Sequence, residues 1–373
     1  MDGDRLIALS IPFFFLFIGM ELLVARARRR RVYRLADAIG DLGCGMAQQL
    51  VLVFVGAALL GVYASVHDRF RLFTLDARTP APWILSFVAV DFLYYWWHRA
   101  SHRVNVLWAA HVVHHQSEDF NLAVALRQAI ATSFTTLPFY LPMAFLGVPP
   151  IVYATMVAVS TLYQFWIHTE LVGKLGPLEW VLNTPSHHRV HHAVNPQYLD
   201  RNYGAALIVW DRLFGTFEEE REAPVYGTVK PFQSFNAVWA QVAYFGELWK
   251  KAAAFPRLRD RLRLWVMPPP WIPAGLSHEP DPEVRGRPKH DPPLSRRVRW
   301  YALLQFVPAV IATALALWYR AEAPRLALAA VAGLVFWTLL SLGGLLDRRR
   351  WAVPAEVSRL VAVIAVAAAV LAR

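Results

Sequence analysis

Long apolar stretches alternate with short charged segments along most of the chain. A membrane-spanning helix needs about 20 mostly apolar residues to cross roughly 30 Å of hydrocarbon. Eight stretches approach or exceed that length, although the third is short. The pattern predicts an all-α fold, a polytopic membrane helical bundle. The predicted spans are Leu6–Ala25, Leu42–Val66, Ala81–Trp97, Asn121–Val148, Pro149–His168, Tyr301–Tyr319, Pro324–Leu346 and Trp351–Ala372.

Basic residues gather in clusters next to the apolar stretches, as at Arg26–Arg34 and Arg348–Arg350. Such clusters mark the cytoplasmic side of a membrane protein. With Arg26–Arg34 inside, counting the crossings places residues 169–300 inside and both ends of the chain outside. Two acidic residues and a single arginine precede the first apolar stretch, which is no basic N-terminal region, so residues 1–34 are interpreted as an N-terminal membrane anchor helix and not as a cleaved signal peptide.

The composition also favours an integral membrane protein. Of the 373 residues, 56% are hydrophobic and only 17% are charged. The net charge of +11 is explained by the basic flanks of the spans, so nucleic acid is not an expected partner. The single cysteine, Cys44, lies in an apolar stretch, which excludes a disulfide framework and a cysteine metal cage. Any bound metal must therefore have other ligands.

Ten histidines fall at the cytoplasmic ends of predicted spans or in the segments that follow them. His98 and His102 are four residues apart, which places both rings on one helix face, one turn apart. Two His-x-x-His-His patterns each add a neighbour rotated by about 100° around the helix, so that each triplet can serve two metals. The sequence thus predicts a cytoplasmic, histidine-rich di-metal cap. The candidate metal ligands are His98, His102, His111, His114, His115, His168, His187, His188, His191 and His192.

A single histidine near a membrane surface is an ordinary amphipathic residue, and this interpretation suffices for His67, His278 and His290. Ten together need another explanation, since burying so many imidazoles without partners is costly. Imidazole binds iron, zinc, copper and nickel alike. Structural zinc takes about four ligands, so this number of histidines favours two metals of higher coordination. The His-Glu-x-x-His motif of zinc peptidases does not occur in the sequence.

Three acidic residues near the histidines are candidates for supporting roles. Asp91 precedes His98 by about two helical turns, and an acid in a membrane span is costly unless it is paired. We expect it to accept a ring N–H from a ligating histidine, with a helix-packing hydrogen bond as the alternative. Glu118 and Asp119 follow His115 and either orient ligands, bind a cofactor or cap the next helix. Asp91 and Glu118 are the candidate catalytic residues, and Glu118 is also the candidate for cofactor binding.

The order of these motifs resembles the fatty acid hydroxylase and sterol desaturase superfamily, whose pattern is HxxxH, HxxHH, a further histidine and HxxHH. Residues 98–192 match it in order. Within the superfamily the chain is most similar to the alkylglycerol monooxygenase family and its bacterial relatives, through residues 117–128 and the run from Leu175 to Phe217. The resemblance covers about residues 35–235, the predicted catalytic core. Residues 236–299 are the predicted basic cytoplasmic or interfacial linker, and residues 300–373 the predicted C-terminal three-helix membrane region.

The resemblance implies an oxygen-dependent lipid hydroxylase or monooxygenase whose histidines hold two iron ions. It implies an ether lipid, a sterol or a fatty acyl chain in the bilayer as substrate. It implies tetrahydrobiopterin as the reductant, or alternatively a ferredoxin or cytochrome b5-type electron-transfer protein. A sterol C5-type desaturase or another lipid desaturase needs the same site. A divalent metal transporter or store is the non-enzymatic alternative, and it would hold its ligands near the middle of the bilayer rather than at span ends.

Overall fold

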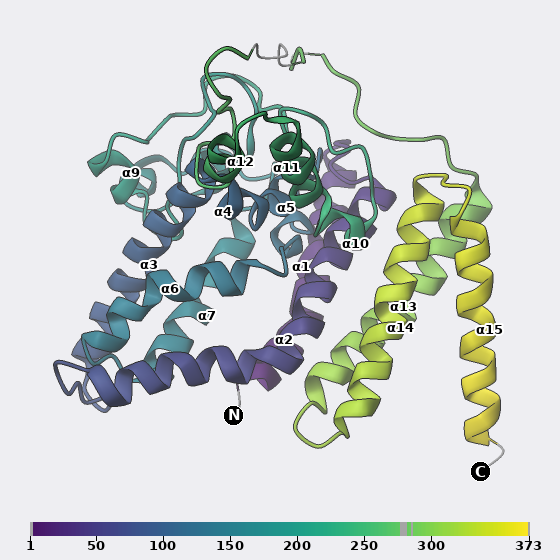
Figure 1. Cartoon of the computed structure of the whole chain (residues 1–373), viewed down its shortest axis with the longest axis horizontal. Helices are drawn as coiled ribbons and strands as arrows, with labels where there is room; N and C mark the ends of the chain where they lie inside the picture. Colours follow the sequence, from purple (N-terminus) through teal and green to yellow (C-terminus); the bar gives the residue numbers. More distant parts are fainter. Residues whose placement is uncertain (1–2, 277–281, 285, 372–373) are drawn as a thin grey trace.

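The computed structural model describes residues 3–276, 282–284 and 286–371, and its regular structure within them is helical. Two isolated bridges, Leu182 to Leu207 and Ala193 to Tyr226, are the β-type pairings among these residues. The all-α prediction is therefore confirmed. Long helices lie below a cap of short helices and loops, and a group of three C-terminal helices stands beside them (Figure 1).

The long helices of the first group are α1 (Gly3–Ala27), α2 (Leu35–Phe70), α3 (Pro80–Arg103), α6 (Thr132–Phe145) and α7 (Pro150–Trp166). The cap holds α4 (Asn105–Ala109), α5 (Val112–His115), α8 (Pro185–His192), α9 (Val209–Leu213), α10 (Ala237–Ala240), α11 (Ala243–Ala254) and α12 (Leu258–Leu264), together with the 3-10 helices η1 (Val124–Leu126) and η2 (Gly176–Trp180). The C-terminal group is α13 (Arg296–Trp318), α14 (Arg325–Leu346) and α15 (Ala352–Leu371).

Local sequence explains where several of these helices begin. α3, α7 and α8 each have proline in the first turn, where the missing N–H costs no helical hydrogen bond. Ser295 caps α13, because its hydroxyl accepts a hydrogen bond from the backbone N–H of Val298. These signals place the start of α3 so that its last turns carry His98 and His102 into the cap.

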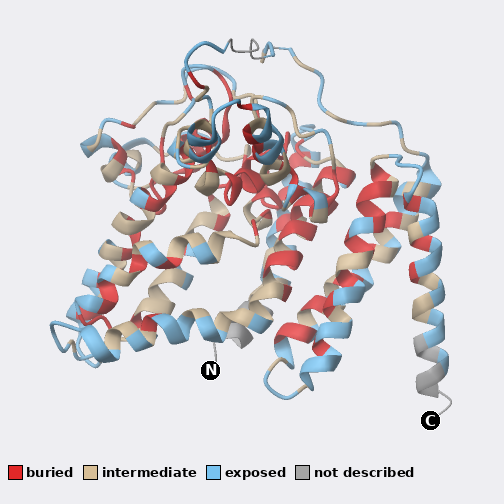
Figure 2. Cartoon of the chain, in the orientation of Figure 1, coloured by how far each residue is buried: buried red, intermediate tan, exposed pale blue. Residues whose placement is uncertain are grey.

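Four helices are long and apolar enough to cross a membrane, namely α1 from Leu9, α2, α13 and α14. Their flanks expose many large apolar side chains, as the alternation of exposed and buried residues in Figure 2 illustrates. The chain is thus an integral membrane protein. α2 has 36 residues and would extend about 54 Å if straight. It bends instead, and its second half runs along the face opposite the cap (Figure 1).

The prediction of one span over Asn121–Val148 is wrong. α6 begins only at Thr132 and has 14 residues. The segment before it stays in the cap because its polar groups have partners there. The Asn121 amide donates to Val32 O at 2.7 Å, and the buried Arg127 guanidinium donates to Val113 O at 2.6 Å. Burying these groups in hydrocarbon would have left them without partners.

The C-terminal helices are held to the rest of the chain by specific polar contacts. The Asp347 carboxylate accepts hydrogen bonds from the Ser234 hydroxyl and from Phe235 N. At Gly343, α14 comes so close to Asn236 that an added Cβ would lie 2.4 Å from its Cα. Buried apolar residues of α2, α13 and α14 form one continuous core next to these contacts. The C-terminal group is therefore packed against α2 and does not hang free of it.

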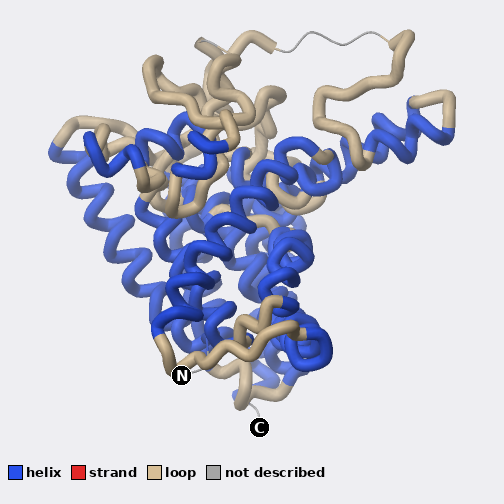
Figure 3. The backbone as a smooth tube through the Cα atoms, turned by 90° about the vertical axis from the view of Figure 1, so that its left-hand side faces the viewer, coloured by secondary structure: helices blue, strands red, loops and turns tan. Residues whose placement is uncertain are grey.

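The arrangement of the two chain ends leads to a prediction on topology. α1 begins and α15 ends on the face opposite the cap, and Figure 3 shows from the side that the longest loops gather at the cap. We expect a reporter fused at residue 225 to be cytoplasmic and one fused after Arg373 to be outside, because the basic flanks keep the cap inside. Paired alkaline phosphatase and fluorescent-protein fusions measure this. A cytoplasmic reporter at both positions would contradict it.

Candidate metal centre

The histidines of the cap come from four separate segments of the chain. α3 ends with His98 and His102, the residues around α5 supply His111, His114 and His115, His168 follows α7, and α8 supplies the others. α8 has eight residues and carries four of the histidines. Each segment ends or begins at the same side of the long helices, so the rings converge although 94 residues separate the first from the last.

Nine of the ten predicted ligands form two groups in which one ring nitrogen of each member lies within 4.8 Å of all the others. Each His-x-x-His-His triplet is divided between the groups, as the helical rotation between neighbours predicts. The first group consists of His98, His102, His111, His115 and His191. The second group consists of His114, His168, His188 and His192.

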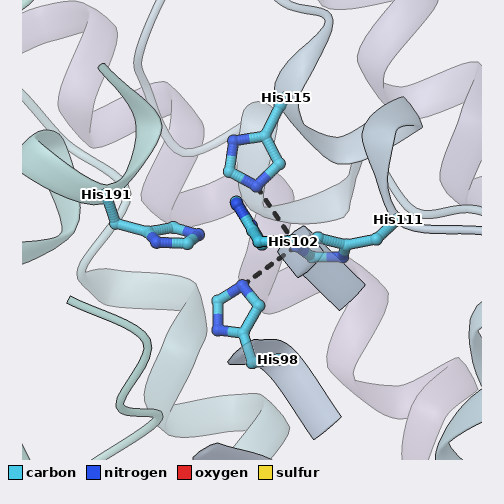
Figure 4. A group of neighbouring side chains, drawn as sticks. All are labelled: His98, His102, His111, His115 and His191. Carbon is cyan, nitrogen blue, oxygen red and sulfur yellow. Dashed lines mark hydrogen bonds between the residues drawn. The ribbon is translucent and has the colours of Figure 1, made fainter. Parts of the chain in front are cut away.

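The five rings of the first group point toward a common centre (Figure 4). His111 Nε2 lies 2.9 Å from His98 Nε2 and 3.1 Å from His115 Nε2, the two contacts drawn as dashed lines. His191 Nε2 and His102 Nε2 are buried without a hydrogen-bond partner. A buried polar atom without a partner is costly, so these two nitrogens favour a cation at the centre.

The second group is equally tight. His168 Nε2 lies 3.1 Å from His114 Nε2 and 2.9 Å from His188 Nε2, and His192 Nε2 lies 3.2 Å from His188 Nε2. The group is completely buried, since each of its members is less than a tenth exposed. Phe120 stacks on the His168 ring with the centroids 5.6 Å apart. Its apolar ring therefore helps to keep water away from this group.

Backbone carbonyls determine which nitrogen of several rings carries the proton. Nδ1 of four histidines lies within hydrogen-bond distance of a carbonyl oxygen, so it must donate, and Nε2 of the neutral ring then has only a lone pair. The carbonyls are those of Tyr203 for His98, Arg127 for His114, Gln164 for His168 and Arg201 for His191. The lone pairs of His114 and His168 consequently face each other at 3.1 Å with no proton between them. A metal ion between them removes this repulsion, so the residues fit a metal centre.

The protonation of the rings agrees with this assignment. Burial lowers the pKa of His111, His115, His191 and His192 well below the ordinary value, and the neighbouring rings lower it further. The pKa of His114 is lowered to about 4, mainly by burial. Neutral imidazole is the form that binds a metal. The rings are thus held in the ligating state at neutral pH.

His187 is the one predicted ligand that lies outside both groups. Its ring faces Phe217, with the centroids 5.4 Å apart, because on α8 it is rotated by about 100° from His188. His67 pairs with Asp68, and the backbone N–H of His290 donates to Glu118. His278 lies outside the described residues.

Asp91 does not contact a histidine, so the expected partner was wrong. Its carboxylate accepts hydrogen bonds from Ala206 N, Leu207 N and the indole N–H of Trp210. Sequence inspection missed Asp211, whose carboxylate accepts from Tyr203 N and Gly204 N at 2.7 Å. Both acids hold the loop that contains Tyr203. This loop supplies the carbonyl that orients His98, so both carboxylates position a ring through the backbone.

Glu118 and Asp119 also turn away from the histidine rings. The Glu118 carboxylate accepts from His290 N at 2.6 Å, and Asp119 binds Arg34 and Lys289. The next regular helix begins beyond them at η1, so the capping alternative is wrong as well. These two acids tie residues 289 and 290 to the cap.

Arg127 is a second residue that sequence inspection missed. Its guanidinium is fully buried and donates to Asp41 at 3.1 Å and to Gln116 at 2.9 Å. Its carbonyl oxygen accepts from Nδ1 of His114. Because a buried charge must be paired, Asp41 in α2 fixes the position of Arg127 and thereby of one ring of the second group.

The sequence that forms this centre is similar to those of lipid-oxidising enzymes. The model of the family described as fatty acid hydroxylase matches residues 83–216, which contain all nine grouped histidines. The chain is 39% identical to the alkylglycerol monooxygenase of Homo sapiens over 351 residues, covering 91% of this chain and 77% of that protein. With the alkylglycerol monooxygenase of Xenopus tropicalis it shares 38% identity, over 90% of this chain and 76% of the relative.

A more distant similarity covers a smaller part of the chain. The ornithine lipid hydroxylase OlsE of Rhizobium tropici is 31% identical over 135 residues, which is 36% of this chain and 41% of that protein. No solved structure matches the chain.

Neighbouring histidines of α8 provide a matched test of the ligand assignment. We expect His188→Ala to lower the bound metal by about half, since it removes one ligand from a group of four. His187→Ala should keep the full metal content, because its ring lies outside both groups. Elemental analysis of the purified proteins measures both. Equal metal loss in the two variants would contradict the division into groups.

The role of Asp211 can be tested with a distant acid as control. We expect Asp211→Asn to weaken metal retention by about tenfold, because an NH2 donor replaces one of the two oxygens that accept from Tyr203 N and Gly204 N, and the loop then holds the Tyr203 carbonyl less firmly against His98. Asp76→Asn, which changes an exposed carboxylate paired with Arg78, should retain metal normally. Competition with a chromogenic chelator measures retention. Unchanged metal retention in Asp211→Asn would contradict a role of this loop in positioning the metal ligands.

Proposed function

Since this chain belongs to the fatty acid hydroxylase family, together with the alkylglycerol monooxygenases, we propose that it is a membrane lipid hydroxylase that cleaves ether lipids with two iron ions and O2. The observation that carries the proposal is the pair of histidine groups with inward-facing nitrogens, four of which have no proton in the neutral ring. The identity of 38–39% with alkylglycerol monooxygenases over nine-tenths of the chain supports the substrate class.

The spacing of the nitrogens supports iron over structural zinc. Two nitrogens about 2.1 Å from one metal lie about 3.0 Å apart at right angles and about 3.4 Å apart at the tetrahedral angle. All nitrogens of a group lie within 4.8 Å of one another, and five pairs of neighbouring nitrogens lie 2.9–3.2 Å apart. They fit right-angled neighbours in a site with more than four positions, and groups of five and four histidines leave room there for a further ligand. We assign His98, His102, His111, His115 and His191 to one iron, and His114, His168, His188 and His192 to the other.

Acid–base chemistry does not break the C–H bond of an alkyl chain, so the reaction needs an oxidant. Two iron ions held by the nine rings would supply the chemistry that reduces O2 and oxidises this bond. The chain supplies orientation and dryness. The carbonyls of Tyr203 and Arg127 fix the tautomers of His98 and His114, while Phe120 shields the second group from water.

An ether lipid suits a hydroxylase because the ether oxygen activates the neighbouring C–H bonds. Hydroxylation at that carbon gives a hemiacetal, which separates into an aldehyde and an alcohol. One oxygen atom of O2 enters the lipid, the other leaves as water, and a reductant supplies two electrons. We propose tetrahydrobiopterin as this reductant, with a ferredoxin or cytochrome b5-type protein as the alternative, and we place the site on the cytoplasmic side.

Labelled oxygen tests the proposed reaction. Membranes that contain the iron-loaded protein receive ¹⁸O2, reduced pterin and a 1-alkylglycerol, and the products are identified by mass spectrometry. We expect a long-chain aldehyde that carries the label, together with glycerol. The variant His191→Ala should form these products about a hundredfold more slowly or not at all, because it lacks one metal ligand. The label is read in the alcohol after immediate reduction, since an aldehyde exchanges oxygen with water.

Other outcomes of the same experiment separate the competing functions. An unlabelled lipid with a new double bond would show that the chain is a desaturase and not a hydroxylase. Metal uptake into vesicles without any change in the lipid would favour a transporter. Failure of the pterin with success of a ferredoxin system would change only the electron donor, since the histidine centre does not depend on the route of the electrons.

A further inference from the structure

An apolar groove of 620 Å³ lies between α1 and the end of α7. Its walls include Phe13 and Phe17 of α1 and Leu162 and Phe165 of α7. This volume is typical of a site that holds a small molecule. The residues 83–216 that match the family model contain the α7 wall of the groove but not its α1 wall.

The rim of the groove carries exposed apolar side chains. Phe13, Phe17 and Leu162 at its rim are 59%, 47% and 52% exposed. α1 is long and apolar enough to cross the membrane, so its exposed flank faces lipid. An occupant therefore enters from the bilayer with an apolar chain.

One end of the groove is polar. The Glu21 carboxylate lines it, is buried, and accepts hydrogen bonds from the hydroxyls of Tyr33 and Thr169 and from Leu122 N at 2.9 Å. Arg28 lies at the same end and donates to Leu171 O at 2.7 Å. An acidic side chain in a membrane helix is costly, and it commonly marks a site of function. This polar end suits an uncharged group with hydroxyls, because both a carboxylate acceptor and a guanidinium donor are present.

Residues of the polar end and of the metal centre are close neighbours along the chain. Phe165 belongs to the apolar wall, His168 to the second histidine group and Thr169 to the polar end. The change from apolar to polar lining thus occurs beside a predicted iron ligand. In an ether lipid, the reacting carbon lies at the same boundary, between the alkyl chain and the glycerol head.

We infer that this groove binds the substrate, a single-chain glycerol ether lipid, with the alkyl chain between α1 and α7 and the glycerol hydroxyls at Glu21 and Thr169. The inference rests on the proposed function for the identity of the lipid. Leu122 and Phe165 line the groove and belong to one apolar cluster. Along the chain they lie two and three residues from Phe120 and His168, whose rings stack, so we assign these two side chains control of how the reacting carbon reaches the centre.

Photo-crosslinking tests the position of the chain without turnover. The full-length protein in nanodiscs is incubated with a 1-alkylglycerol that carries a diazirine in its chain, irradiated, digested and mapped by mass spectrometry. We expect adducts on residues 13–20 and 162–166. Leu162→Trp should reduce this labelling by about tenfold and raise KM with kcat little changed, because the larger ring fills the groove.

A lipid-facing residue elsewhere provides the control. Leu304 in α13 is 64% exposed on another membrane helix, so Leu304→Trp should leave labelling and KM unchanged. Metal content and thermal unfolding of both variants are compared with those of the unaltered protein to verify folding. Adducts that map to other helices, or labelling that is insensitive to Leu162→Trp, would overturn the inference. Labelling in the groove without ether cleavage would refute the proposed function and leave the binding site intact.

The polar end is tested by comparing two ligands. Glu21→Gln should weaken competition by a 1-alkylglycerol by about tenfold and leave competition by a chain-matched ether without hydroxyls unchanged. An equal loss for both ligands would assign Glu21 to holding α1 against the cap and would overturn its part in binding the head.

Discussion

The mutual repulsion of buried nitrogen lone pairs is the constraint on which this structure depends. His114 and His168 point proton-free nitrogens at each other across 3.1 Å, and four further pairs of ring nitrogens in the cap lie 2.9–3.2 Å apart. Protonation could relieve the repulsion in water, but burial holds the pKa of His114 at about 4. A cation bound between the two nitrogens would relieve the repulsion, so this arrangement favours a metal centre.

Acids that were expected beside the rings act instead on the backbone that orients them. Asp91 and Asp211 accept hydrogen bonds from N–H groups of residues 203–210. The same loop places the Tyr203 carbonyl against Nδ1 of His98. Arg127, neutralised by Asp41 of α2, presents its own carbonyl to His114. A carbonyl accepts a hydrogen bond from Nδ1 and so sets the tautomer, while burial keeps the ring neutral. A carboxylate in direct contact would raise the affinity of the ring for protons instead.

Much of the centre could be predicted from sequence because its rules are local. The four-residue spacing of His98 and His102 and the two His-x-x-His-His triplets determine which rings share a helix face, and the division of each triplet between two groups follows from helical rotation. Tertiary contacts decided the rest. Asp91 has partners more than 100 residues away, which no spacing rule indicates. His187 and His188 are chemically identical neighbours, and only the direction of α8 against Phe217 separates them.

Tertiary contacts also explain why the membrane spans were predicted less accurately than the metal ligands. An apolar run indicates that a segment is buried or faces lipid, but not the direction in which it runs. Residues 121–131 are therefore apolar enough to extend the α6 span in the sequence pattern, although the buried Arg127 side chain hydrogen-bonds within the cap. α2 similarly continues beyond the length of one crossing and bends along the opposite face (Figure 1). Ligands that lie between His98 and His192 must be brought together across four helical segments. Binding of a metal ion at these groups would contribute to the free energy of folding, because inward-facing nitrogens are costly without a partner and an ion would stabilise them.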